Sequence, residues 1–139
     1  MNIKIKLLPG GTIPTRGSRE AAGYDIYAAE DAEIQPLEIR KIRTGICIQM
    51  LPGYFGQIYG RSGLAAKRGL LSVAGTLDSD FNGEVHVVLF NASGDTQKIY
   101  KGNRIAQVVF HKHQIADWSI VDELEATERG DGAFGSTGI

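Results

Sequence analysis

Thr76-Leu-Asp-Ser-Asp-Phe-Asn-Gly-Glu-Val-His-Val-Val-Leu-Phe90 is the stretch from which the fold is predicted most clearly. Asn82-Gly83 tolerates positive φ at both positions and therefore favours a type I′ turn, which would join residues 76–81 to residues 84–90 as a β-hairpin. The second half begins with alternating apolar residues and becomes continuously apolar, as in a strand covered on both faces. Such a strand lies in a sandwich or at a contact between subunits.

Alternation with a period of two continues on both sides of this stretch. In residues 3–7, three apolar side chains share one face and two lysines share the other. One short helix is expected around residues 64–68, with Ser62 near its N-cap and Gly69 ending it. Short strands at this spacing favour an all-β sandwich or barrel, in which Trp118 is expected to belong to the core. The other predicted strands cover residues 24–28, 42–50, 54–59, 96–100, 104–111 and 118–121.

Composition indicates one soluble domain. The chain has 139 residues, of which 42% are hydrophobic and 22% charged, and its 18 glycines imply many tight turns. The charges of its 15 basic and 16 acidic side chains nearly cancel, which argues against a protein that binds the phosphate backbone of a nucleic acid. The lone Cys47 cannot form an internal disulfide, and we see neither a signal peptide nor a membrane span. We therefore expect a soluble intracellular protein that makes no membrane contact, cytoplasmic or, in a eukaryote, nuclear.

The C-terminal residues 129–138, Arg-Gly-Asp-Gly-Ala-Phe-Gly-Ser-Thr-Gly, are the one marked change in composition. Because glycine loses much chain entropy on ordering, we expect this tail to be mobile until a ligand orders it. Its guanidinium, aromatic ring, hydroxyls and unhindered N–H groups suit phosphates and a flat ring. Taken alone, the tail is better explained by a frayed terminus.

Two short segments carry groups that suit a phosphate. Gly60-Arg-Ser-Gly63 places an arginine and a hydroxyl where a strand passes into the predicted helix, and Gly102-Asn-Arg-Ile-Ala-Gln107 adds a second arginine and an amide. Taken alone, the first segment is better explained by a serine cap beside a surface arginine. Ordinary strand residues explain the second.

Two carboxylates need an explanation. Asp25 lies within an apolar strand, where it either pairs with an arginine, holds a hydrated cation or faces water. Asp78 is either a general base or a residue that caps a turn. His111 and His113 would share one strand face, but the spacing of zinc ligands is absent, so we do not expect a transition-metal site.

Five ordered motifs together resemble the homotrimeric dUTP pyrophosphatase (dUTPase) family over nearly the whole chain. They are Ala22–Ala28, Gly60–Ala65, Gly75–Gly83, Gly102–Gln107 and Arg129–Gly138. The resemblance implies a β jelly roll of the β-clip type with one short helix and a flexible arm, divided into a domain of residues 1–128 and an arm of residues 129–139.

The resemblance also implies an activity and an assembly. The enzyme would hydrolyse dUTP with Mg²⁺ to dUMP and pyrophosphate, which keeps uracil out of DNA and supplies dUMP for thymidylate synthesis. Its homotrimer would share active sites: the first, second and fourth motifs come from one subunit, the third from a neighbour and the tail from the remaining subunit.

Roles follow from the same resemblance. Asp78 matches the carboxylate that activates the attacking water, and Asp25 matches one that contacts the Mg²⁺ water shell. Phe81 matches the aromatic residue, usually Tyr, under the deoxyribose, and the backbone from Gly75 to Gly83 would read uracil. The remaining matches are the phosphate contacts Arg61, Ser62, Gly63 and Gln107, and the tail contacts Arg129, Phe134, Gly135, Ser136 and Thr137.

Three further departures from the family pattern and two alternative functions remain. Gly60, Asn103 and Ala133 stand where Pro, Asp and Gly are usual. A related dCTP deaminase would need a glutamate on the strand after the hairpin, roughly where this chain has Val88 and Leu89. The absence of that glutamate argues against a deaminase. A binding or regulatory protein that has lost turnover is the other alternative.

Overall fold

The computed structural model describes residues 1–138, so that Ile139, the end of the predicted arm, lies outside the described residues. This part of the chain forms ten strands and one helix. In chain order they are β1 (Lys4–Leu7), β2 (Tyr24–Tyr27), β3 (Ala32–Ile34), β4 (Ile39–Gln49), β5 (Tyr54–Tyr59), α1 (Ser62–Arg68), β6 (Leu70–Ala74), β7 (Thr76–Asp78), β8 (Glu84–Asn91), β9 (Gln97–Ile99) and β10 (Arg104–Lys112).

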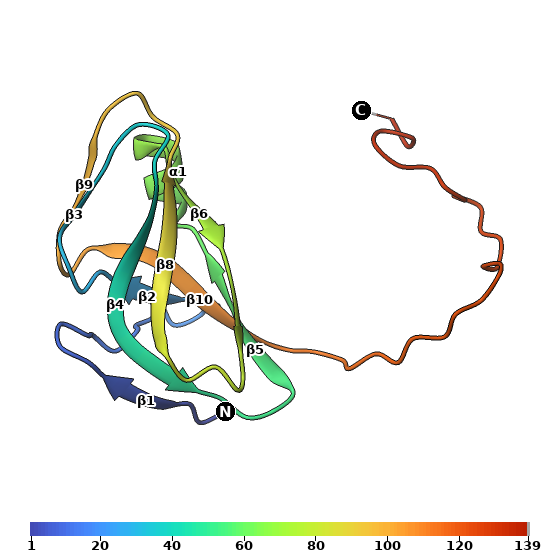
Figure 1. The fold of residues 1–139 in the computed structure, drawn as a ribbon, viewed down its shortest axis with the longest axis horizontal. Helices are drawn as coiled ribbons and strands as arrows, with labels where there is room; N and C mark the ends of the chain where they lie inside the picture. Colours follow the sequence, from blue (N-terminus) through green and yellow to red (C-terminus); the bar gives the residue numbers. More distant parts are fainter. Residues whose placement is uncertain (139) are drawn as a thin grey trace.

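The strands form two antiparallel four-stranded sheets around one apolar core. One sheet has the order β1-β4-β8-β6 and the other the order β2-β10-β5-β7, while β3 and β9 form a separate pair (Figure 1). Alternate residues of the longer strands enter the core, for example Ile42 and Val87 from the first sheet and Ile58 and Val108 from the second. This arrangement confirms the predicted all-β jelly-roll class.

The predicted helix is confirmed with a shift at its start. It begins at Ser62, so that Arg61 rather than Ser62 occupies the N-cap position. Gly69 ends it in the left-handed conformation, with φ of 64°, and its N–H bonds to the carbonyls of Leu64 and Ala65. Nowhere in residues 1–138 is a helix long and apolar enough to cross a membrane.

The predicted tight hairpin at Asn82-Gly83 is wrong. β7 pairs with β5 in one sheet, whereas β8 pairs with β4 and β6 in the other. The chain turns before Asn82, because the Phe81 N–H bonds to the Asp78 carbonyl at 3.1 Å. Asn82 and Gly83 therefore connect two sheets rather than two partners in one ladder.

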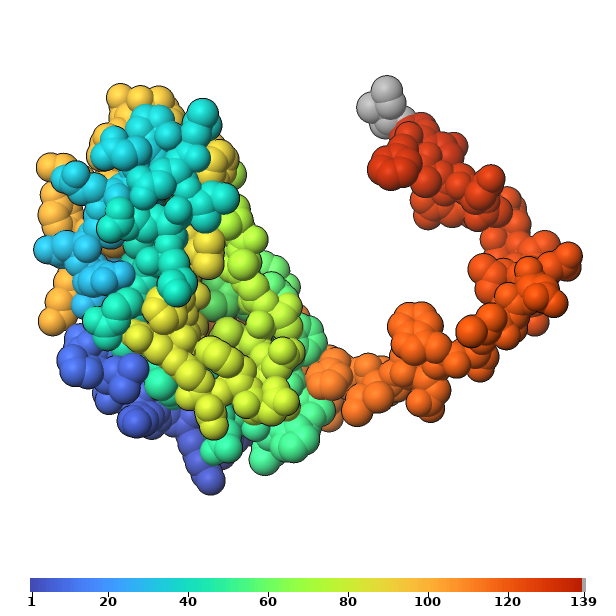
Figure 2. Space-filling model, in the orientation of Figure 1, coloured from blue at the N-terminus to red at the C-terminus, as the bar shows by residue number. Residues whose placement is uncertain are grey.

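The predicted strand over residues 118–121 is also wrong. After β10 the described chain leaves the body as a long extended segment (Figures 1 and 2). Trp118 is 92% exposed and Ile120 is equally uncovered, so Trp118 is not a core residue of this chain. The alternation is present, but the chain itself supplies no partner strand for these residues within its described part.

A bulge in β4 brings Gly45 and Gly11 into close approach. Gly45 has φ of 67°, and a Cβ there would lie 2.6 Å from the Cα and N of Gly11. We expect Gly45→Ala to lower the free energy of unfolding by about 1–3 kcal/mol, through strain and overpacking. Gly53→Ala is the matched control, because Gly53 has φ of 88° but nothing within 4 Å. Denaturation at one fixed protein concentration that finds equal losses would contradict a role for the close approach.

Candidate functional site

A cavity of about 290 Å³ lies where β7 meets the start of β8. Gly75, Asp78 and Phe81 line it, so three residues assigned from the third motif come together. Gly83 lies beside them, since a Cβ there would lie 3.0 Å from the Phe81 ring. The volume is at the lower end of the range for ligand pockets, which suits a single base.

The entry to this cavity is fixed by backbone pairing. The Gly75 carbonyl accepts a hydrogen bond from the Ile58 N–H at 3.0 Å, and Asp78 stands opposite Phe55 at the end of β7. Leu77 is buried in the core, so its neighbour Asp78 must point to the outer face of the sheet. A carboxylate is thus held beside a base-sized cavity and remains open to solvent.

A second cavity, of about 350 Å³, is lined by the residues assigned to the phosphate chain. Arg61, Ser62 and Gln107 contribute to it, and Gly63 follows in the first turn of α1. The Gln107 amide donates to the Gly60 carbonyl at 3.2 Å, which fixes its side chain across the strand-to-helix junction. This cavity therefore presents a guanidinium, a hydroxyl and an amide together.

Asp25 pairs with two arginines, which is the first of the alternatives left open by the sequence. Its carboxylate lies 3.4 Å from the Arg61 Nε and 3.6 Å from an Arg104 guanidinium nitrogen, and its side chain is 14% exposed. Arg61 also lines the second cavity. Within residues 1–138 no group of three or more His, Cys, Asp or Glu residues is arranged to hold a metal ion.

Asp78 and Gln107 lie well apart within one chain, although the linings of the two cavities come within two residues of each other at Ile58 and Gly60. Asp78 is opposite Phe55, and Phe55 is opposite His111 on β10, four positions after Gln107. At about 3.3 Å per residue and 4.8 Å per strand, the backbones of Asp78 and Gln107 are separated by roughly 16 Å. The backbone of Asp78 therefore stands away from that of Gln107 in the same chain.

The tail residues lie apart from both cavities. Arg129 bonds within the tail to the Gly132 carbonyl at 2.8 Å, and Phe134 is fully exposed (Figure 2). Ser136 and Thr137 are likewise exposed. Positive φ occurs at Gly130, Phe134, Gly135 and Gly138, so that Ala133 adopts an ordinary φ in this arrangement.

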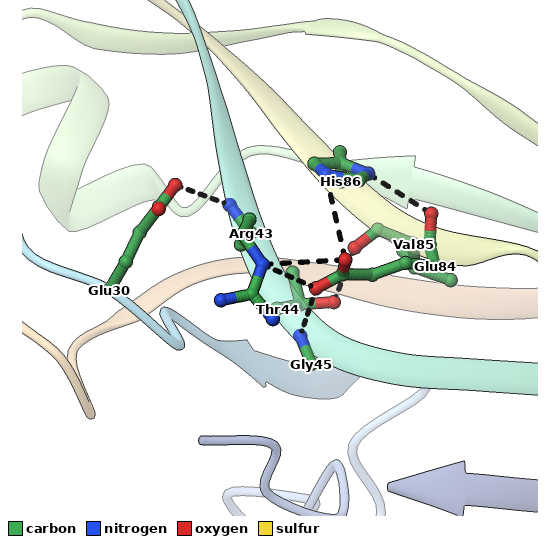
Figure 3. Close-up of polar contacts among 7 residues, drawn as sticks. All are labelled: Glu30, Arg43, Thr44, Gly45, Glu84, Val85 and His86. Carbon is green, nitrogen blue, oxygen red and sulfur yellow. Dashed lines mark hydrogen bonds and ion pairs between the residues drawn. The ribbon is translucent and has the colours of Figure 1, made fainter. Parts of the chain in front are cut away.

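Two ionisable residues that line the base-sized cavity, Glu84 and His86, are not among the site residues predicted from the sequence. Burial alone would raise the pKa of Glu84, but hydrogen bonds from Arg43 and the Gly45 N–H, with the charges of Arg43 and His86, lower this pKa below its usual value (Figure 3). A carboxylate at the start of an otherwise apolar strand was the signal that could have revealed it.

His111 and His113 both pack on the ring of Phe55. The His111 ring stacks at 5.2 Å between centroids, and the His113 ring meets the Phe55 ring edge-on at 6.1 Å. Their side chains thus form an aromatic cluster on the outer face of β10 and β5.

The fold places the chain in a class of jelly-roll proteins that includes solved dUTPases. A mutant dUTPase of Staphylococcus bacteriophage 80alpha, determined with dUpNHpp, is similar over 99% of both chains, with a TM-score of 0.93 and 28% identity. The family model described as dUTPase matches residues 10–138, and the chain belongs to the dUTPase family.

Two curated relatives extend this likeness over nearly the full length. The deoxyuridine 5'-triphosphate nucleotidohydrolase of Paramecium bursaria Chlorella virus 1 is 45% identical over 96% of this chain and 95% of its own length. The enzyme of the same name from Saccharomyces cerevisiae is 46% identical over 98% of this chain and 94% of its own.

Proposed function

We propose that the protein hydrolyses dUTP to dUMP and pyrophosphate. The observation that carries this proposal is the placement of Asp78, Gly75 and Phe81 around one base-sized cavity in a chain of the dUTPase family. Its relatives are named for the same reaction. The reaction removes dUTP before it enters DNA and supplies dUMP for thymidylate synthesis, inside the cell.

Asp78 acts as the general base in this proposal. Its carboxylate takes a proton from a water molecule as the water oxygen bonds to the α-phosphorus, and the bond to the oxygen bridging the α- and β-phosphorus breaks on the opposite side. Pyrophosphate leaves with that oxygen. Arg61, Ser62, the Gly63 N–H and Gln107 hold the phosphates in line and neutralise their charge.

Recognition of the nucleoside is assigned to the first cavity. The backbone from Gly75 to Gly83 reads the uracil edge, and its narrow mouth excludes the methyl group of thymine. The Phe81 ring packs under the deoxyribose and leaves no space for a 2′-hydroxyl. Its side chain is 42% exposed, so it is available to a sugar.

A homotrimer with shared sites accounts for the separation of Asp78 and Gln107. The roughly 16 Å between Asp78 and Gln107 is too long for one α-phosphate to meet both in one chain. Motifs one, two and four would come from one subunit, the third from a neighbour and the arm from the remaining one. The apolar side chains of Ile115, Trp118, Ile120 and Leu124, all strongly exposed, would be covered by such neighbours.

The residues present fit Mg²⁺ that arrives with the triphosphate. Hard Mg²⁺ keeps several waters and accepts few protein ligands, and the described chain offers the paired Asp25 rather than a carboxylate cage. Asp25 would contact the water shell of the ion. When bound, the ion supplies charge neutralisation on the triphosphate.

Pyrophosphate release from dUTP, dTTP, dCTP and UTP, each with and without Mg²⁺, tests the function. Of the four nucleotides, we expect only dUTP to release pyrophosphate rapidly, and we expect this release to depend strongly on Mg²⁺. Ammonia released from dCTP would indicate a deaminase instead. Tight dUTP binding without pyrophosphate would indicate the regulatory alternative.

A further inference from the structure

Glu84 occupies a break in the hydrogen-bond ladder between β4 and β8. The pairing runs regularly to Arg43–His86, and the next pair is Cys47–Glu84, so β4 bulges in between. At the break side chains replace ladder bonds. The Glu84 carboxylate accepts hydrogen bonds from the Arg43 Nε at 3.1 Å and the Gly45 N–H at 3.0 Å (Figure 3).

Other side chains complete the bulge from different directions. The Thr44 hydroxyl donates to the Val85 carbonyl, and the Glu30 carboxylate accepts a hydrogen bond from the Arg43 N–H at 2.9 Å. Glu30 therefore supports the same bulge as Glu84. Of the two glutamates, Glu84 alone lines the base-sized cavity.

The position of Glu84 connects this bulge to the loop of residues 75–83. The upstream end of the loop is held by β7 pairing with β5 and by the Ile58–Gly75 hydrogen bond. The downstream end passes directly from Gly83 into Glu84, the first residue of β8. The contacts of Glu84 therefore set where this end of the loop lies.

Removing the Glu84 carboxylate would leave two donors without their acceptor. The Glu84 side chain is 18% exposed and that of Arg43 is 38% exposed, so water reaches them only in part. Gly45 is buried, and its N–H would lose its partner. The start of β8 would then shift or loosen, while β7 and Asp78 would keep their pairing with β5.

We propose that Glu84 is a positioning residue that fixes the base-binding loop through Arg43 and Gly45. This inference rests on the proposed dUTP hydrolysis. Glu84→Ala raises KM for dUTP about tenfold and changes kcat by less than about threefold, because the loss affects base binding more than Asp78. Discrimination against dTTP falls in parallel, since the cavity mouth is less well fixed.

The test compares Glu84→Ala with Glu84→Gln and with Glu30→Ala. The glutamine keeps an acceptor for Gly45 and Arg43, so the KM of Glu84→Gln stays close to that of the wild type. Glu30→Ala weakens the same bulge, but Glu30 does not line the cavity. This variant should therefore lose as much thermal stability as Glu84→Ala and keep the KM of the wild type. Equal KM increases in the two alanine variants would show a merely structural role and overturn the proposal.

Amide hydrogen exchange of residues 75–83 gives a readout that does not depend on the substrate. Exchange in this loop is faster in Glu84→Ala than in wild type and unchanged in Glu30→Ala. Loop exchange that is unchanged in Glu84→Ala overturns the positioning role even if the wild type hydrolyses dUTP. A wild type that fails to hydrolyse dUTP rejects the proposed function, whereas the exchange result still decides the role of Glu84 in the loop.

Discussion

Asp78→Asn is expected to lower kcat for dUTP by about 10²–10⁴-fold, the range for loss of a positioned general base. Asparagine keeps the size of the side chain but cannot take a proton from water. Asp78 is exposed at the end of β7, and the backbone pairing of β7 with β5 fixes its position. Folding and dUTP binding should therefore be close to those of the wild type.

Steady-state pyrophosphate release, calorimetric binding of dUTP and thermal denaturation together measure this result. Asp80→Asn is the matched control, because Asp80 lies two residues away and outside the lining of the cavity. Its turnover should be unchanged. If Asp78→Asn retains most of its turnover, another group activates the water, and Asp78 loses the assigned role.

The strands were predictable because alternation records which face of each strand is buried. Tyr54–Tyr59 begins and ends as predicted, and β8 alternates between buried Val85, Val87 and Leu89 and less buried neighbours. The hairpin was predicted wrongly, because Asn-Gly describes local turn preference alone. The pairing of β7 with β5, which buries Leu77 in the core, decided the outcome, and that contact is between residues distant in sequence.

Local sequence also could not reveal which charges meet. Asp25 is 36 positions from Arg61, and the pair forms because β2, β10 and β5 are adjacent. Glu84 and Arg43 meet at a bulge in β4 that no short sequence pattern predicts. Trp118 is expected in a core because it is a large aromatic residue, but the residue type does not show which chain covers it.

Deleting residues 129–139 is expected to lower kcat/KM for dUTP by at least about 10²-fold and to leave an assembled trimer. The deletion removes Arg129 and the aromatic ring of Phe134, two groups assigned to the γ-phosphate and the base. The hydrogen bonds of residues 129–138 are local ones, such as Ser136 to Ala133, so the core loses no support. Size-exclusion chromatography with light scattering measures assembly.

Emission of Trp118, the single tryptophan, checks the same point independently. Trp118 lies before the deletion, so its emission should match that of the full-length trimer. A dissociated protein would show that the arm holds the assembly together rather than closing over the site. Phe134→Ala in the full-length chain is the milder companion variant and should lose part of the activity.

Mixing the two inactive proteins tests which chain supplies which group. Full-length Asp78→Asn subunits carry the arm, and the truncated subunits carry Asp78. If the arm and Asp78 of one site come from different subunits, random 1:1 trimers regain about one quarter of the wild-type sites, since two independent choices must each be right. If both come from one chain, the mixed trimers regain no sites. That second result would show that the arm and Asp78 of one site belong to the same subunit, and would overturn the proposed origin of the arm from a further subunit.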